Sequence, residues 1–383
     1  MKIKPNIRKT FIALSLLIVV SFTIPAYAAD GNHETDNNTT VINYDDIEDL
    51  VLENNLRLKS NKYSLDDMED ALDDLEEARD EIREMQREIY SLSGSITAPE
   101  GPGGSIANAT KASLNVAGGS LGMSLPSTRD VREQIQLAEL NFAYAGKQLV
   151  SASKELFLLY HQINDSLIQI ERNSQLLESK IGKAMISYEY GYVLSSTLDD
   201  LESSLKELNN KYDTILHQKD LLLLNFKNLI GVKSSEDIEL GNIPELSREF
   251  ISQIDFESDI KEAIKNSMSI GIRKKELKNA DASGKRINNE VKIRKNEIEV
   301  ELKNQYQLLI QQDNILLLAE NNLNILENKL TKGHVQFNVG NITKSNLDSL
   351  TNEVENQKSR IEIDRNNLFK EIEKYKAMVA GMI

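Results

Sequence analysis

The side chains that most often perform catalysis or hold metal ions are few in this sequence, and they are far apart. No two histidines have the spacing of a metal site, and no H-E-x-x-H motif occurs; the four are His33, His161, His217 and His334. His161 is interpreted as a residue on a helix surface. Nucleophile-elbow, P-loop and G-x-G-x-x-G patterns are missing too. We therefore predict a protein that is not an enzyme and that has no metal, cofactor or small-molecule substrate site.

Negative charge is densest in one block of the sequence. Ten carboxylates lie between Asp66 and Glu81, with Arg79 as the one basic residue among them. Their spacing does not match an EF-hand calcium loop, so the block is interpreted as a solvated helix face. Residues 29–255 together contain 20 basic and 41 acidic side chains. This excess argues against a nucleic-acid partner, whose phosphates must be neutralised by Lys and Arg.

The N-terminal residues predict an exported protein. Residues 1–28 combine four early basic side chains, a short apolar core and the small-residue sequence Ala26-Tyr27-Ala28, which is typical of a cleaved secretory signal. No other stretch approaches 18 apolar residues, so we expect no transmembrane helix in the mature chain. The chain has no cysteine, which excludes disulfides and a lipid anchor on a cysteine. The polar residues 29–43 are expected to be flexible.

Long helices with narrow apolar stripes are predicted for most of the remaining chain. Apolar residues recur at steps of three and four from about residue 45 to 90, from about 130 to 190, and from about 196 to 230. The last two stripes have heptad spacing, and their short connection predicts an antiparallel coiled-coil hairpin. Residues 232–255 are interpreted as a linker. The helical pattern then resumes at Phe256 and hardly pauses until Phe337.

Residues 91–127 interrupt the helical pattern. Seven glycines and three prolines occur in this stretch, which is also rich in Ser, Ala and Thr. This composition predicts a loop. The stretch offers at most one short β-hairpin, with residues 113–116 paired against residues 121–125.

The sequence contains two copies of one helical hairpin, offset by 149 residues. The pairs that match at this offset are Gly191 with Gly340, Leu198 with Leu347, Asp199 with Asp348, Leu201 with Leu350 and, after one inserted residue, Gly231 with Gly381. The apolar seams match in the same register. We therefore predict an all-α fold of long antiparallel coiled-coil hairpins in two tandem repeats, 44–231 and 256–383, with the Gly-rich insertion in the first alone.

The two tip sequences resemble those of the TolC family of export-duct proteins. Residues 188–201 and 337–350 each carry a glycine turn followed by a helix start of the form L-D-x-L, as TolC-family chains do in both of their tandem repeats. The resemblance covers residues 44–381. It implies a homotrimer whose helices form a hollow cylinder and whose tips meet a membrane transporter or a periplasmic adaptor. The positions that it assigns to this partner are Gly191, Tyr192, Val193, Gly340, Asn341 and Ile342.

The chain departs from the family pattern in two ways. Outer-membrane members contribute four strands per chain to a barrel, whereas this chain offers two at most, without the alternation that lipid-facing strands need. The acidic residue that the family often places six positions after the tip glycine is replaced by Thr197 and Asn346. We therefore expect a divergent member without a complete barrel, which acts in the cell envelope as a duct for efflux or secretion.

A coiled-coil scaffold of the envelope with no role in transport is the alternative. A duct wall needs apolar residues on two faces of each helix, whereas a monomeric bundle needs one. Additional apolar residues such as Leu158 and Leu159 lie off the main stripe of the first long helix. They favour the duct.

Overall fold

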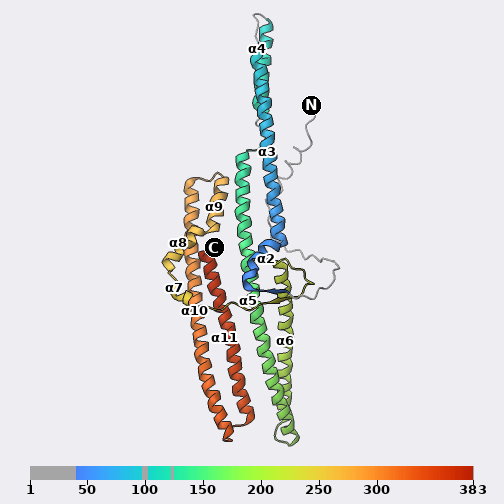
Figure 1. Cartoon of the computed structure of the whole chain (residues 1–383), viewed down its shortest axis with the longest axis vertical. Helices are drawn as coiled ribbons and strands as arrows, with labels where there is room; N and C mark the ends of the chain where they lie inside the picture. The colour runs from blue at the N-terminus through green and yellow to red at the C-terminus, as the bar shows by residue number, and fades with distance from the viewer. Residues whose placement is uncertain (1–39, 97–101, 122–124, 383) are drawn as a thin grey trace. The chain divides into compact units, whose positions relative to one another are not determined.

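The computed structural model of the protein describes residues 40–96, 102–121 and 125–382 (Figure 1). The predicted signal sequence and residues 29–39 lie outside the described residues. The described chain is built of helices and one pair of short strands, so the predicted all-α fold is confirmed. It divides into a smaller unit of residues 62–138 and a larger unit of residues 40–61 and 139–382.

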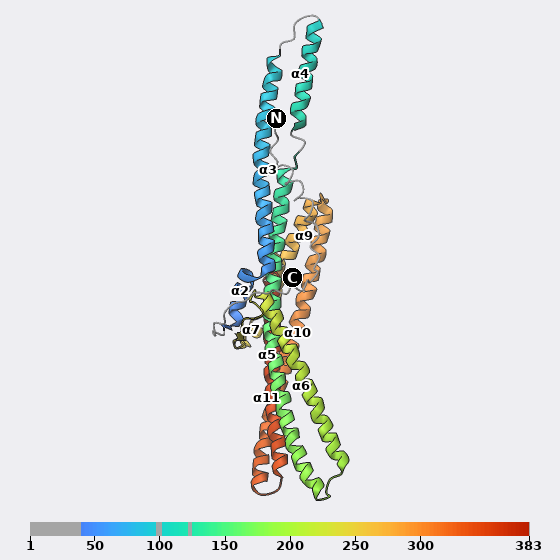
Figure 2. The same ribbon diagram turned by 90° about the vertical axis from the view of Figure 1, so that its right-hand side faces the viewer.

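The smaller unit consists of three helical segments. They are the main part of α3 (Leu56–Ser95), α4 (Pro102–Leu121) and the first turns of α5 (Thr128–Glu189). α4 lies alongside α3 in both views (Figures 1 and 2). The loop or β-hairpin predicted within residues 91–127 is therefore wrong over residues 102–121, because the first expected strand, residues 113–116, lies inside α4. Residues 97–101 and 122–124 lie outside the described residues.

α4 is helical despite its glycines because it packs closely on α3. A Cβ atom on Gly118 would lie 3.3 Å from the Tyr90 ring, a contact tight enough that the ring would have to shift slightly. Gln86 Nε2 donates a hydrogen bond to the Gly118 carbonyl at 2.8 Å. Arg79 Nη2 donates to the Pro126 carbonyl at 2.7 Å, just before α5 begins. Tertiary contacts thus outweigh the low helix propensity of the segment.

The acidic block lies along the exposed side of α3. A small apolar cluster occupies the opposite side of the helix and joins it to α5; its buried members are Leu75, Val131 and Ile135. The carboxylates that are exposed include Asp66, Asp67, Glu69, Asp70, Asp73, Asp74, Glu77, Asp80 and Glu81. This arrangement agrees with the interpretation of the block as a solvated helix face.

Two long helical hairpins dominate the larger unit. The first pairs α5 with α6 (Ser195–Leu229), and the second pairs α10 (Gly284–Asn338) with α11 (Lys344–Val379). These helices lie side by side in the order α10, α11, α5, α6, and both tips are at the same end of the unit (Figure 1). The short elements are η1 (Tyr44–Asp46), α2 (Ile47–Asn54), α7 (Glu249–Gln253), α8 (Phe256–Asn266) and α9 (Met268–Asn279). The turn at 280–283 separates α9 from α10, where the sequence predicted an almost continuous helix.

Each hairpin ends at its base on a glycine that touches another helix end. Gly231 and Gly381 have φ angles of 73° and 95°, a region that side chains with a Cβ atom disfavour. A Cβ on Gly231 would lie 2.2 Å from the carbonyl oxygen of Asn54, and a Cβ on Gly381 would lie 2.1 Å from that of Asn266. The two repeats therefore have the same closing contact.

A pair of strands joins the beginning of the first repeat to the linker. β1 (Thr40–Ile42) pairs in parallel with β2 (Ile238–Leu240). The Gly241 amide then donates to the Ile42 carbonyl at 2.8 Å. Residues 40–43 thus differ from the flexible segment that was expected, because the buried Ile42 and the β2 backbone fix them in place.

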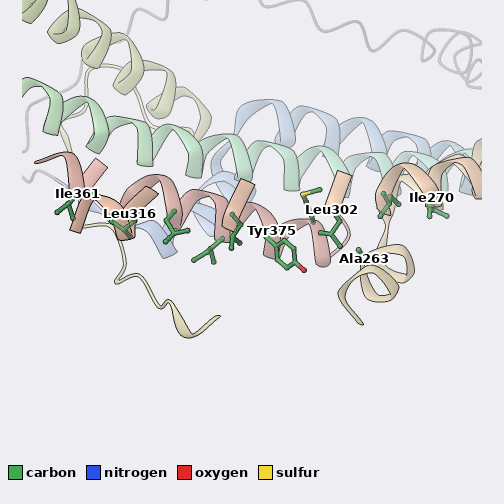
Figure 3. Close-up of a cluster of buried hydrophobic side chains, with 12 residues drawn as sticks. Ala263, Ile270, Leu302, Leu316, Ile361 and Tyr375 are labelled. Carbon is green, nitrogen blue, oxygen red and sulfur yellow. The ribbon is translucent and has the colours of Figure 1, made fainter. Parts of the chain in front are cut away.

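Two apolar clusters hold the larger unit together. One lies between α10 and α11 and extends to α8 and α9; Figure 3 shows it around Leu302, Leu316 and Tyr375. The other surrounds Phe157 and Phe226 at the base of the first hairpin. Phe369 on α11 belongs to this second cluster, so the second repeat completes the core of the first.

Candidate partner-binding site at the helical tips

Both tips are tight turns closed by the same backbone hydrogen bonds. The Gly191 amide donates to the Tyr188 carbonyl at 2.9 Å, and the Gly340 amide donates to the Phe337 carbonyl at 3.0 Å. The amide of the following residue closes each turn with a second bond, at 2.9 Å and 2.7 Å. Because the two glycines have φ angles of 73° and 78°, both turns are helix C-caps of the Schellman type. The chain reverses at both predicted positions.

The first tip exposes a group of large side chains. Tyr190 and Tyr192 are 72% and 84% exposed, and Leu194 is 74% exposed. The centroids of the two tyrosine rings are 6.5 Å apart. Gly191 is exposed as well, whereas Val193 is half-buried. Sequence reasoning missed Tyr190 and Leu194, although aromatic residues at alternate positions around a turn glycine were a signal for an exposed cluster.

The second tip has the same pattern of exposure as the first. Gly340 and Asn341 are exposed, but Ile342 is half-buried. Gly333 on α10 makes room for this packing, since a Cβ there would lie 2.6 Å from Leu350 Cδ1 and 3.9 Å from Ile342 Cδ1. Ile342 therefore packs toward its own hairpin.

An ion pair links the two hairpins close to their tips. Lys183 on α5 lies 3.8 Å from the Asp348 carboxylate on α11, and Lys344 lies 2.9 Å from the same carboxylate.

The six predicted contact residues lie at one end of the larger unit, in two turns of the same backbone form. Their contact with a partner stays a prediction.

Beyond the apolar cluster around Phe157, polar side chains link α5 to α11. Asn173 Oδ1 accepts hydrogen bonds from the amides of Asn352 and Asn356 at 2.9 Å and 3.0 Å. Gln162 Nε2 donates to Asn367 Oδ1 at 2.7 Å. Amide pairs of this kind fix the register of two helices, although each contributes little net stability.

Two titratable groups on α5 have shifted pKa values at this level of the bundle. Burial raises the pKa of Asp165 to about 6, and the negative charge of Glu362 on α11 adds to the shift. Burial also lowers the pKa of His161, which lies beside the Phe157 ring at a centroid distance of 4.9 Å. His161 is thus partly buried, where an open surface position was expected.

A row of apolar side chains on α10 is exposed to solvent in the single chain. These residues lie on the faces of α10 that α11 does not cover. The row comprises Ile293, Val300, Leu308, Leu318, Ile325 and Val335. Fewer exposed leucines lie on α6, at Leu216, Leu221 and Leu224.

Neither a metal site nor a membrane-crossing helix is found in the described ranges. Among residues 40–96, 102–121 and 125–382, no three His, Asp or Glu side chains are grouped so that they could hold a metal ion. Over the same ranges, none of the helices combines the length and the apolar character needed to span a bilayer.

Solved structures of outer membrane channels share the arrangement described above. The CmeC outer membrane channel of Campylobacter jejuni matches 95% of this chain and 94% of its own length, with 10% identity and a TM-score of 0.50. CusC, whose crystal structures address transmembrane channel formation, matches 89% of this chain and 96% of its own, with 10% identity and a TM-score of 0.51. No protein-family model and no curated protein sequence matches the chain. The chain therefore has the TolC-like fold that these outer membrane channels share.

Proposed function

We propose that this protein is a divergent TolC-family duct component of an efflux or secretion system. In this proposal it is exported to the cell envelope, assembles as a homotrimer, and meets a transporter or a periplasmic adaptor through its helical tips. The shared fold supports a duct, because the solved structures that have this fold are outer membrane channels.

The exposed apolar row on α10 carries this proposal. A helix of a soluble monomer needs one apolar face, yet α10 has a fully buried stripe toward α11 and a second apolar row that is open to solvent. Large apolar side chains exposed along one helix in this way favour a protein interface. In a closed ring, α10 at one edge of each chain would lie against α6 at the opposite edge of the next chain.

The mass of the mature protein in solution tests the assembly. Static light scattering after size exclusion should give three times the mass of one chain. The double variant Leu318→Glu and Ile325→Glu should give the mass of a monomer with unchanged helical circular dichroism, because both side chains are exposed in the single chain. A matched control changes two exposed amides of the same helix, Asn321→Glu and Asn324→Glu, at which the structure has no apolar contact to lose.

A wild-type protein that stays monomeric at high concentration would contradict the duct. In that case the envelope scaffold becomes the better description, because a scaffold requires no ring. A trimer that the Leu318→Glu and Ile325→Glu variant leaves intact would place the interface on another face.

A further inference from the structure

The turns at the two tips impose the same backbone, so their side chains can be compared position by position. Gly191 and Gly340 have nearly equal φ angles, and nothing lies within 4 Å of a Cβ built on either glycine. The offset of 149 residues pairs Tyr190 with Val339 and Tyr192 with Asn341. Because the turn geometry does not demand tyrosine, the aromatic residues of the first tip need another explanation.

Two side chains of the second tip make contacts within their own hairpin. Thr343 Oγ1 caps α11 by accepting a hydrogen bond from the Asn346 amide at 3.2 Å. Ile342 packs toward Gly333, as described above. At the first tip the residue that matches Thr343 is Leu194, which is exposed and makes no side-chain cap. The two tips therefore have the same pattern of exposure, but the first tip presents two tyrosines and a leucine at positions where the second tip has Val339, Asn341 and a threonine that caps its own helix.

The first tip also has more exposed carboxylates than the second tip. Glu189, Asp199, Asp200 and Glu202 are exposed around the first tip, and within the described residues no ion pair involves them. Three of the four matched positions in the second tip are uncharged, namely Asn338, Ser349 and Thr351. The fourth is Asp348, whose charge is neutralised by Lys183 and Lys344.

We propose that the first tip is the dominant docking surface and that it binds a protein partner with an apolar pocket rimmed by Lys or Arg. Exposed tyrosines supply much of the binding energy at protein interfaces when they enter such pockets. The surrounding carboxylates favour a basic rim, which also places cations over the tyrosine rings. The second tip contributes to the shape of the end without a comparable contact. This inference rests on the proposed function, since it assumes that the tips meet a partner.

Site-specific photo-crosslinking in the cells that make the protein tests the inference. Benzoylphenylalanine is placed in the full chain either at Leu194 or at Val339, which are similarly exposed at 74% and 65%. At position 194 we expect adducts with a protein other than the chain itself. Their yield should be at least five times the yield at position 339. The crosslinked peptide of that protein should carry Lys or Arg next to apolar residues.

Exchange of side chains between the tips provides the matched variants. Tyr190→Val with Tyr192→Asn gives the first tip the residues of the second and should reduce the position-194 adduct at least fivefold. The reverse exchange, Val339→Tyr with Asn341→Tyr, should leave that adduct unchanged. Since both turns keep their glycine and their hydrogen bonds, folding is monitored by helical circular dichroism and should not change.

Equal yields from the two positions, or a position-194 adduct that survives the tyrosine exchange, would overturn the inference and leave the proposed function standing. Adducts formed only with another copy of the same chain would also overturn it. A complete lack of adducts with other proteins at either tip would count against both the inference and the proposed function.

Discussion

The two hairpins of the larger unit have the same turns but are packed to different depths. On α11, Leu347, Val354 and Ile361 are buried, whereas the matched residues of the α6 seam, Leu198, Leu205 and Tyr212, are half-buried. α11 has α10 on one side and α5 on the other, whereas α6 lies at the edge beside α5 (Figures 1 and 2). Heptad spacing therefore specifies which faces meet, and the number of neighbours decides how deeply they are buried.

Substitution of the glycine at the base of either hairpin should lower the free energy of unfolding by a similar amount, even though the helices of the two hairpins are packed to different depths. Gly231→Ala and Gly381→Ala should each lower the free energy of unfolding by at least about 3 kcal/mol, because the new Cβ would meet a backbone carbonyl in a left-handed conformation. Gly191→Ala has the same φ but open space around it, so it should cost only about 1 kcal/mol. Urea unfolding followed by circular dichroism measures all three. Similar values for Gly231→Ala and Gly191→Ala would mean that the base contact is looser than described.

Truncation of a leucine at matched positions of the two hairpins should have different effects on the free energy of unfolding. Leu347→Ala removes a buried side chain from α11 and should cost about 3 kcal/mol of unfolding free energy. Leu198→Ala changes the matched, half-buried position on α6 and should cost about 1 kcal/mol. The same unfolding experiment, performed on monomeric protein, compares them. If the two costs are equal, the first hairpin is packed as tightly as the second.

Asp165 should make the contact between the hairpins depend on pH. Its pKa is about 6 in the folded chain and 3.8 as a free side chain, mainly because of burial. Between these pH values the folded state keeps a proton on Asp165 that the unfolded state has released. The contribution of Asp165 to the free energy of unfolding is therefore most favourable below pH 4, and this advantage is lost as the pH rises through 6. Asp165→Asn should therefore stabilise the protein at pH 7.5 by about 1 kcal/mol, after allowance for solvent screening of a half-exposed group.

Thermal unfolding of Asp165→Asn and wild type between pH 4 and pH 8 gives the curve. The advantage of the variant should shrink as the pH falls below 6. Asp364→Asn is a useful comparison, since burial raises the pKa of Asp364 as well but Arg360 opposes the shift. An advantage of Asp165→Asn that does not change with pH would show that Asp165 is not the titrating group.

The hairpins and their register were predictable from sequence because each signal is local. A glycine between two heptad seams, as at Gly191 and again at Gly340, specifies a reversal, and the common offset specifies two equivalent hairpins. The side-chain environment of the tips was less predictable. Val193 and Ile342 were assigned to the partner from the resemblance to TolC-family tips, whereas their burial depends on packing within each hairpin.

The features that sequence reasoning missed depend on contacts between distant residues. α4 contains several glycines, and its helical state is stabilised by α3 through residues such as Tyr90 and Gln86. β1 and β2 are three residues each and lie on either side of the whole first repeat, so neither has a local pattern of its own. Weak propensities leave such segments to be decided by tertiary structure.

Phe369 has a consequence for the order in which the chain can fold. It lies on the last helix, yet its ring packs edge-on against Tyr44 at a centroid distance of 5.2 Å, near the first described residues. The core of the first repeat thus stays unfinished until almost the whole polypeptide has been synthesised. If the chain is secreted from its N-terminus, the first repeat crosses the membrane before Phe369 does. Part of the apolar surface of the first repeat then remains exposed until Phe369 arrives. A holding chaperone at that stage would shield it from aggregation.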